Sequence, residues 1–184
     1  MKNSFFSFGR KAKAILAAAV IVFSFGLMSC QQETDDDNSL SDFLIYNYLS
    51  SDERIYGTWT SSYGENFIIS GSTFSNAYNG STTYAGDNVS ISWTSATSGY
   101  IYFKYTRAAK ADWTYSSDSS EAPDVGKWYA VAFKDLQILK STVSLSGAYK
   151  AGGATSTATL EEAKSEFTIE NGYFARYSDC TRSN

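Results

Sequence analysis

Residues 100–106 read "YIYFKYT", and their side chains alternate along the chain. Every second residue, Ile101, Phe103 and Tyr105, falls on one face of an extended chain, and the residues between them fall on the other. A period of two is typical of a half-buried β-strand. The stretch therefore predicts a strand, and it gives the pattern to search for in the rest of the chain.

The same alternation recurs on both sides of this stretch. It is found in "NVSISW" at 88–93, "WYAVAF" at 128–133 and "TVSLSG" at 142–147. Shorter strands are predicted in "YGTWTS" at 56–61, "ENFIIS" at 65–70 and "STFSNAY" at 72–78. These runs are rich in β-branched and aromatic residues and are separated by Gly, Ser and Asn, which is the usual composition of strands and their turns.

The end of the chain carries a turn signal and a helix signal. Asn171-Gly172 separates "SEFTIE" at 165–170 from "YFARYS" at 173–178 and predicts a hairpin, since a type I′ turn requires positive φ at both central residues. Before it, Thr159 and Glu162 have the spacing of a capping box, with Leu160 and Ala163 as the apolar face of one short helix.

About 125 residues follow Ile55, enough for one domain with its own core. Eight or nine short antiparallel strands and one late helix indicate an all-β fold, either a sandwich or a closed barrel. Closure removes exposed sheet edges, which favours a single up-and-down barrel. We expect this domain to span residues 55–184.

The first 29 residues have the composition of a secretory signal. Four basic residues precede the run "AILAAAVIVFSFGLM" at 14–28, which is too short to cross a bilayer comfortably. The next segment spans residues 30–54. After Cys30 it contains the acidic stretch "QQETDDDNS" at 31–39 and then "DFLIYNYL" at 42–49. We expect an acidic tether followed by a short N-terminal helix or an extended plug.

The junction after this run, Leu27-Met28-Ser29-Cys30, resembles the lipobox of bacterial lipoproteins. The resemblance implies cleavage before Cys30, attachment of diacylglycerol to its sulfur and acylation of the new N-terminus. Because Gln31 replaces the aspartate that retains some lipoproteins in the inner membrane, we expect a bacterial cell-envelope protein, lipid-anchored at the outer membrane or cell surface. With Cys30 lipidated, Cys180 has no partner for an internal disulfide.

Gly57 and Trp59 stand at the start of the first predicted strand. A Gly-x-Trp in this place resembles the first-strand signature of lipocalins and their calycin relatives. In that family the tryptophan closes the narrow end of the barrel, and a basic residue on or after the last strand packs across its ring. The resemblance therefore assigns this barrel-closing role to Gly57, Trp59 and, on the predicted final strand, Arg176.

The composition excludes several kinds of chemistry. The chain has no histidine, so triads that need one and the usual zinc sites are ruled out. Without the four basic residues of the signal segment, 11 basic residues face 19 acidic ones, a formal charge of −8. Such a surface repels nucleic acid. We expect no enzyme activity, no cofactor, no metal and no nucleic-acid partner.

The aromatic content, 14 Tyr, 12 Phe and 4 Trp, suits a binding pocket or a binding surface. Candidate ligand contacts lie on the strands near one end and in the long irregular stretch 108–126; they are Phe103, Tyr105, Trp113, Tyr115 and Tyr129. We expect a non-enzymatic barrel that binds a small apolar or amphipathic ligand. The alternatives are a filled barrel that acts as a surface adhesion or protein-interaction module, and a lipocalin-shaped protease inhibitor.

Overall fold

The computed structural model describes residues 44–48 and 50–183. They belong to two compact units that divide between Ser51 and Asp52, and each unit is described by itself. In the first, residues 44–48 and 50 are helical, which favours the helix over the extended plug. None of the described helices combines the length and the apolar character needed to span a membrane. The predicted signal segment, residues 1–29, and Cys30 lie outside the described residues.

The second unit is built almost entirely of strands. In chain order its elements are η1 (Asp52–Arg54), β1 (Gly57–Ser61), β2 (Glu65–Ile69), β3 (Thr73–Tyr78), β4 (Ser81–Trp93), β5 (Gly99–Ala109), β6 (Tyr115–Ser116), β7 (Trp128–Gln137), β8 (Thr142–Gly147), α3 (Leu160–Glu166) and β9 (Ser178–Ser183). The all-β prediction and the short helix near the C-terminus are both confirmed.

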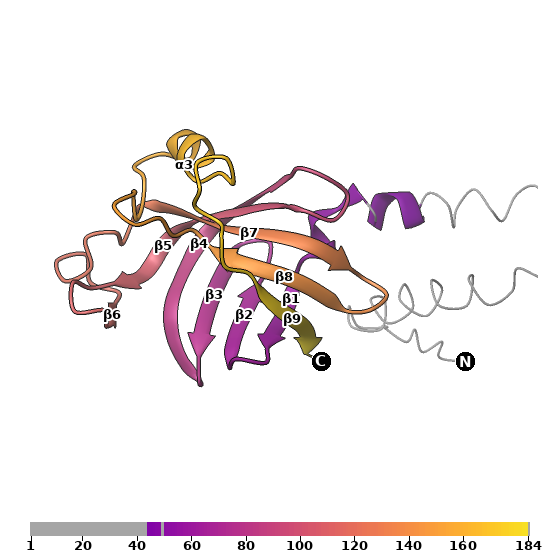
Figure 1. The fold of residues 1–184 in the computed structure, drawn as a ribbon, viewed down its shortest axis with the longest axis horizontal. Helices are drawn as coiled ribbons and strands as arrows, with labels where there is room; N and C mark the ends of the chain where they lie inside the picture. The colour runs from indigo at the N-terminus through magenta and orange to yellow at the C-terminus, as the bar shows by residue number, and fades with distance from the viewer. Residues whose placement is uncertain (1–43, 49, 184) are drawn as a thin grey trace, which may run out of the picture. The chain divides into compact units, whose positions relative to one another are not determined.

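Eight of these strands close into a barrel. Each pairs antiparallel with its neighbours in the order β4-β3-β2-β1-β9-β8-β7-β5, and β4 also pairs with β5. Consecutive strands are neighbours throughout, so this is an up-and-down barrel, as predicted. The two-residue β6 pairs with β5 alone and is an addition to the ring. In Figure 1 the sheet curls so that β7 and β8 lie across from β2 and β3.

The first and last strands of the barrel form its closing seam. Across it, Trp59 of β1 pairs with Arg182 of β9, and Ser61 pairs with Cys180. The Oγ1 atom of Thr60 lies 2.7 Å from the Oγ atom of Ser183, which adds a side-chain hydrogen bond to the backbone ladder. The seam leaves neither strand with an open edge.

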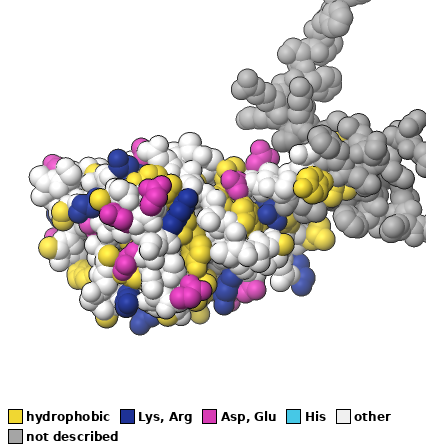
Figure 2. Space-filling model, turned by 90° about the horizontal axis from the view of Figure 1, so that it is seen from above, with side chains coloured by type: hydrophobic (Ala, Val, Ile, Leu, Met, Phe, Trp, Pro, Cys, Tyr) yellow, Lys and Arg dark blue, Asp and Glu magenta, His cyan; other side chains and the backbone are white. Residues whose placement is uncertain are grey.

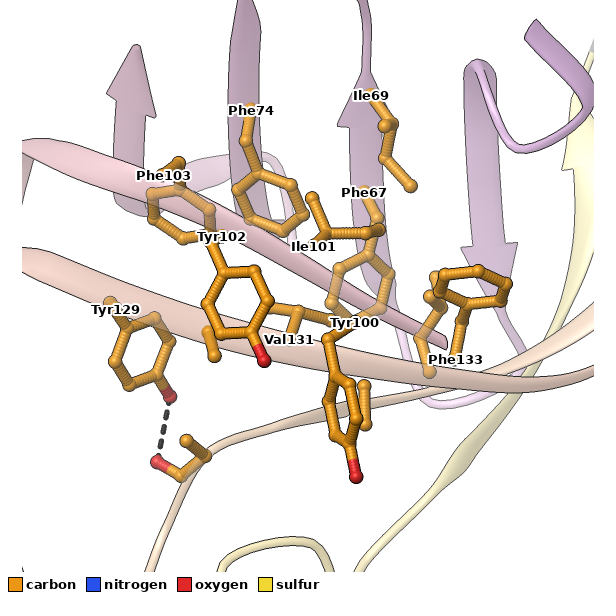
Figure 3. Packing of buried hydrophobic residues seen from close by; sticks show 14 of the residues in the cluster. Phe67, Ile69, Phe74, Tyr100, Ile101, Tyr102, Phe103, Tyr129, Val131 and Phe133 are labelled. Carbon is orange, nitrogen blue, oxygen red and sulfur yellow. Dashed lines mark hydrogen bonds between the residues drawn. The ribbon is translucent and has the colours of Figure 1, made fainter. Parts of the chain in front are cut away.

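The register separates an inward face from an outward face, because directly paired residues lie on the same side of a sheet. Inward side chains include Trp59, Phe67, Phe74, Ile101, Phe103, Val131 and Phe133, all at most 2% exposed. Figure 3 shows Phe67, Phe74 and Phe103 together, whereas the hydroxyls of Tyr100 and Tyr102 point to the other side of β5. The C-terminal connection covers those two tyrosines, with Phe174 lying 5.5 Å from Tyr100 between ring centroids.

The barrel has two ends with different connections. In an up-and-down barrel alternate connections lie at the same end, so the turns 62–64 and 79–80 share one end with the connections 110–127 and 148–177. We call this the loop end. Two hydrogen bonds between connections agree with this placement: Asn79 N donates to Gly64 O at 3.0 Å, and Ser156 Oγ donates to Asp124 Oδ1 at 2.7 Å. The opposite end holds η1.

The capping box of α3 is present as predicted. Thr159 accepts a hydrogen bond from the Glu162 backbone N–H, and the Glu162 carboxylate accepts from the Thr159 N–H. Ala163 is buried, and Phe167 ends the helix as its C-cap residue. Because α3 packs against β7 and β5, it fixes the position of the connection 148–177 on the barrel.

The predicted final hairpin is wrong. Asn171 and Gly172 do form a turn, and Gly172 has φ of 83°, but neither flank belongs to a strand. Residues 165–170 end α3 and enter this turn, where the Asn171 side chain donates to the carbonyls of Ser165 and Glu166. The turn therefore closes the helix, and the last strand begins later, at Ser178.

Candidate functional site at the loop end of the barrel

The end opposite the loops is sealed by tryptophans and arginines. Trp59 is fully buried, and its Nε1 donates to the Ile55 carbonyl at 2.8 Å. Arg182 lies over the ring, with its Cζ 4.5 Å from the ring centroid, and its Nη2 donates to the Arg54 carbonyl at 2.7 Å. Gly57, with φ of 132°, faces the stem of Arg182.

The basic residue that packs across the Trp59 ring is thus Arg182, and the prediction of Arg176 for this position is wrong. Arg176 is exposed and lies in the irregular segment before β9, whereas Arg182 pairs directly with Trp59 across the seam. The prediction fails because a hairpin at Asn171-Gly172 would place the last strand too early in the chain. Trp59 itself stands where the sequence predicts it.

A second arginine packs on a second tryptophan at this end. Arg54 has its Cζ 3.9 Å from the centroid of the Trp93 ring, and the Trp93 Nε1 donates to Asp52 Oδ1 at 2.7 Å. Arg54 also donates to the Ala96 carbonyl at 2.8 Å. With one guanidinium over each ring and both indole N–H groups satisfied, this end has the contacts of a structural closure.

Near the loop end, four aromatic side chains from three neighbouring strands form the tyrosine cluster, defined as Tyr84, Phe103, Tyr105 and Tyr129. Every pair of these rings has a centroid distance between 4.9 and 6.4 Å. Phe74 extends the cluster by stacking on Phe103 at 4.3 Å. Aromatic rings in such contacts gain packing energy beyond the area that they bury.

The tyrosine hydroxyls of the cluster lie deep in the protein. Burial is the main reason why the pKa of Tyr84, Tyr105 and Tyr129 is raised above its usual value. The Tyr129 hydroxyl donates to the Ala148 carbonyl at 2.8 Å (Figure 3). Gly147, which has no side chain, leaves room for both the Tyr84 and the Tyr129 hydroxyls. At neutral pH these phenols are therefore neutral hydrogen-bonding groups.

Polar side chains line the wall beside the cluster. Glu65, two residues before the inward Phe67 on β2, accepts a hydrogen bond from Ser178 Oγ, and its Oε2 lies 3.5 Å from Ser61 Oγ. Its carboxylate contributes, after burial and Tyr129, to the raised pKa of Tyr84. The charge of Glu65 is therefore close enough to act on the tyrosine cluster.

Asn76 of β3 is 4% exposed, and its side-chain amide is only half satisfied. Thr83 Oγ1 donates to Asn76 Oδ1, but Nδ2 has no hydrogen-bond partner among residues 44–48 and 50–183. Exchanging the amide oxygen and nitrogen leaves Oδ1 without a partner instead, because Thr83 reaches only one of them. A buried amide atom without a partner costs about 1–3 kcal/mol.

The loop-end connections cover the cluster from outside. Phe167 at the end of α3 lies 5.8 Å from the Tyr129 ring, between centroids. In the connection 110–127, Tyr115 is near enough to add to the raised pKa of Tyr84 and Tyr129, after burial. Three of the predicted contacts, Phe103, Tyr105 and Tyr129, are thus in mutual ring contact, and Tyr115 lies on β6, which pairs with the end of β5.

Trp113, the fifth predicted contact, is not part of this group. It is 76% exposed at the tip of a tight turn, where Lys110 N donates to Thr114 O at 2.7 Å. Its φ of 64° is unusual for a bulky residue. Asp112 holds the turn by accepting from both the N–H and the hydroxyl of Thr114. Local hydrogen bonds thus present Trp113 to solvent.

Two residues of this site, Tyr84 and Glu65, are not predicted from the sequence. Tyr84 lies in the first half of β4, where "STTYAGDN" at 81–88 lacks a clean alternation. A glycine stands at position 86 because a side chain there would collide with the Phe103 ring, and a β-bulge follows at Asn88. In the sequence, Glu65 precedes "NFII" and follows Gly64, so it is expected to be an exposed acidic residue of a turn. The inward position of Phe67 two residues later is the signal that could have found it.

Cys180 is an inward residue of the seam rather than a reactive thiol. It is 2% exposed, and its Sγ donates to the Ser178 carbonyl at 3.4 Å. Burial, and after it the charges of Glu65 and Asp179, raise the pKa of Cys180 to about 12. The thiol therefore stays protonated at neutral pH and packs as a small side chain.

Comparisons of the chain with protein-family models, with curated proteins and with solved structures found no match. The protein is therefore described by its architecture, a closed antiparallel barrel of eight strands with one additional short strand and one short helix near the C-terminus.

Proposed function

We propose that the chain is a non-enzymatic, lipid-anchored barrel of the lipocalin-like, calycin type that binds a small apolar or amphipathic ligand at its loop end. The observation that carries this proposal is the tyrosine cluster with the half-satisfied Asn76 beside it. Aromatic walls with a few placed polar groups are the usual lining of small-molecule sites.

The partial exposure of Tyr84 favours a ligand-binding site at the loop end and not an interior that is filled by side chains alone. Part of its side chain is accessible to solvent, although burial raises the pKa of its hydroxyl well above the usual value. A ligand at the loop end could therefore contact Tyr84 without displacing the rest of the cluster. No hydrogen bond of the Tyr84 hydroxyl to another described residue is found, which leaves this group available to a ligand.

The calycin assignment is supported by the closure at the η1 end. The resemblance implies a tryptophan after a glycine on the first strand and a base across its ring, and Gly57, Trp59 and Arg182 have this arrangement. With one end sealed, a ligand would enter from the loop end. The envelope location rests on the lipobox at Leu27–Cys30 alone.

Native mass spectrometry tests the ligand proposal. The whole chain, extracted in mild detergent from the cells that make it, should carry a small molecule that is released on unfolding. Tyr84→Ala should lose this molecule, while Tyr63→Ala, at an exposed tyrosine of the turn 62–64, should keep it. Recovery of the unmodified chain without any bound molecule would contradict the proposal.

The anchor is tested separately. Replacing Cys30 with Ser should abolish incorporation of radiolabelled palmitate and release the protein from the membrane fraction. Cys180→Ser is the matched control and should keep its label. Labelling that persists in the Cys30 variant would overturn the assignment of the anchor.

A surface-interaction function is the second candidate, and the exposed Trp113 favours it. Tyr63, Tyr78 and Tyr149 are also more than half exposed and lie at the loop end, where Tyr63 and Tyr149 belong to connections and Tyr78 is the last residue of β3. Elsewhere, Figure 2 shows Lys and Arg side chains mixed with Asp and Glu, which gives no single-sign patch on that face. Exposed aromatics of this kind are enriched where proteins bind one another.

A photoreactive amino acid at position 113 tests this second candidate in intact cells. The matched control is position 139, because Leu139 is 80% exposed in the turn between β7 and β8 at the opposite end. Adducts to one protein from position 113, with none from 139, would support the interaction module. Equal labelling from both positions would contradict it.

A further inference from the structure

The cation–π contacts of the barrel do not involve its tyrosine cluster. At the η1 end the guanidinium groups of Arg54 and Arg182 lie over the rings of Trp93 and Trp59. The remaining cation–π contacts among the described residues involve Lys134 and Lys150, which lie over Tyr177 and Tyr173 and not over the tyrosine cluster. The rings of the cluster therefore have no cation packed on them within the part of the chain that the structure describes.

The charged groups that act on the cluster are carboxylates. Glu65 contributes to the raised pKa of Tyr84, and Asp124 contributes to that of Tyr105, in each case after burial and neighbouring tyrosines. Asp124 already has Lys127 as an ion-pair partner at 3.6 Å. Glu65 is thus the carboxylate of this end whose charge can act on a bound molecule.

Glu65 has no counter-ion within residues 44–48 and 50–183. The two ion pairs found there are Lys110–Glu121 and Lys127–Asp124, both in the connection 110–127. The partners of Glu65 are instead the hydroxyls of Ser61 and Ser178. Hydroxyl donors stabilise a carboxylate but do not neutralise it, so its negative charge remains available within the barrel wall.

The surroundings of Glu65 are those that attract a positive charge. Aromatic faces carry negative electrostatic potential and bind cations, and they do so more strongly where water is displaced. The cluster presents three phenol rings and one phenyl ring at the same end of the barrel as Glu65, which is the first residue of β2 after the turn 62–64. Because the Glu65 carboxylate accepts from Ser178 of β9, it lies beside the seam. Its charge also contributes, after burial, to the raised pKa of Cys180.

Asn76 supplies an independent sign of an absent partner. It pairs with Phe67 across the β2–β3 ladder and accepts from Thr83, so it lies next to the strand positions of Glu65 and Tyr84. Its unpaired amide atom is buried on the same wall. In the exchanged orientation of the amide, Nδ2 donates to Thr83 Oγ1 and the unpaired atom is Oδ1, which can accept a hydrogen bond from an ammonium group. An entirely apolar molecule would leave it unsatisfied.

We propose that the loop-end site selects small organic cations: amines with an aromatic or aliphatic body that packs on the tyrosine cluster and an ammonium group that faces Glu65. This inference rests on the proposed ligand-binding function and adds the charge of the ligand. The formal charge of −8 outside the signal segment agrees with it, since such a protein concentrates cations near its surface.

Three probes of similar shape and different charge test the inference by isothermal titration calorimetry on the full chain in detergent. They are 2-phenylethylamine, a cation at pH 7, 2-phenylethanol, which is neutral, and 3-phenylpropanoate, an anion. We expect the amine to bind at least about tenfold more tightly than the alcohol and the anion to bind most weakly. This comparison uses the unmodified protein, so it does not depend on the folding of any variant.

Glu65→Gln should reduce the preference for the amine over the alcohol to less than about threefold while it keeps the affinity for the alcohol. Glu170→Gln, at an exposed acid in the turn after α3, is the matched control and should leave the preference unchanged. Equal or tighter binding of the alcohol or the anion by the unmodified chain would overturn the cation inference and leave the ligand-binding function standing. Binding of none of the three probes would overturn both.

Discussion

At the scale of single residues, the two ends of the barrel use aromatic side chains in different ways. At the η1 end, Trp59 is fully buried, with Arg182 over its ring and its N–H group bonded. Near the loop end, Tyr84 has several ring neighbours but keeps some accessible surface. The first arrangement stabilises the fold, and the second is the place where we propose that a ligand binds.

This difference leads to a prediction for matched tryptophans. Trp59→Ala should lower the free energy of unfolding by about 3–5 kcal/mol, because it leaves a large cavity and removes the stacking partner of Arg182. Trp113→Ala should change it by less than about 0.5 kcal/mol, since Trp113 is exposed. Urea unfolding followed by tyrosine fluorescence measures both. Similar losses in the two variants would contradict the closure role of Trp59.

At the scale of elements, α3 is short and depends on its cap. Seven residues are too few for a stable isolated helix, so its hydrogen bonds at Thr159 and the burial of Ala163 and Phe167 have to hold it. Because Phe167 also touches Tyr129, the position of α3 is linked to the tyrosine cluster.

Thr159→Ala should therefore lower the stability of α3 by about 1 kcal/mol, the usual contribution of an N-cap side chain. Hydrogen exchange measured by mass spectrometry over residues 160–166 should become faster, and the strands should keep their protection. Thr155→Ala, at an exposed threonine nearby, is the matched control and should leave the exchange unchanged. Unaltered exchange over α3 in the Thr159 variant would show that the capping box contributes little to it.

The sequence predicts most elements, for a physical reason that can be stated strand by strand. In β5 and β7 every second residue is an inward apolar or aromatic side chain, and this series is visible in the sequence although the outward face is largely buried as well. In β9 the inward side chains are Ser178, Cys180 and Arg182, which show no apolar alternation, and for that reason the sequence does not locate this strand.

The candidate site is only partly predictable on the same grounds. Phe103, Tyr105 and Tyr129 lie on strands with clear alternation, so their common face follows from the sequence. The contributions of Tyr84 and Glu65 depend on the register of β4 and β2 with their neighbours, which a single sequence does not give. The sequence does not show that Trp113 stands apart from the cluster, because a loop residue has no face that its sequence position defines.

At the scale of the whole molecule, buried tyrosines make stability depend on alkaline pH. Tyrosine in an unfolded chain ionises with a pKa near 10, whereas burial raises the pKa of Tyr102 to about 12 and raises that of Tyr84, Tyr105 and Tyr129 as well. The folded state therefore binds more protons than the unfolded state above about pH 10. Since stability falls with pH in that case, the contribution is complete below about pH 10 and is lost as pH rises through the folded values.

We expect the free energy of unfolding to start to fall near pH 9, where the Cys180 thiol ionises only in the unfolded chain, and to fall more steeply from about pH 10 to 12 as the tyrosines follow. Urea titrations across this range measure the free energy, and ultraviolet difference absorbance reports tyrosine ionisation at each pH. A fraction of the tyrosines should ionise only when the protein unfolds. Constant stability up to about pH 12 would contradict the burial of these phenols.

The closed ring predicts that the last strand is required for the whole barrel. Deleting residues 178–184 removes β9 and exposes the edges of β1 and β8, so cooperative unfolding and the near-ultraviolet circular dichroism of the packed aromatics should both be lost. Thr181→Ala, at an exposed position of β9, should keep both signals. A truncated chain with native near-ultraviolet signals would show that the sheet does not need closure.

The seam also determines when the protein can finish folding. Thr60 and Ser183 are 123 positions apart in the chain, and they meet only when the ring shuts. Every other strand of the barrel precedes β9 in the chain. The ring therefore cannot shut until β9 has been synthesised, and its closure depends on contacts of high sequence separation, which form slowly.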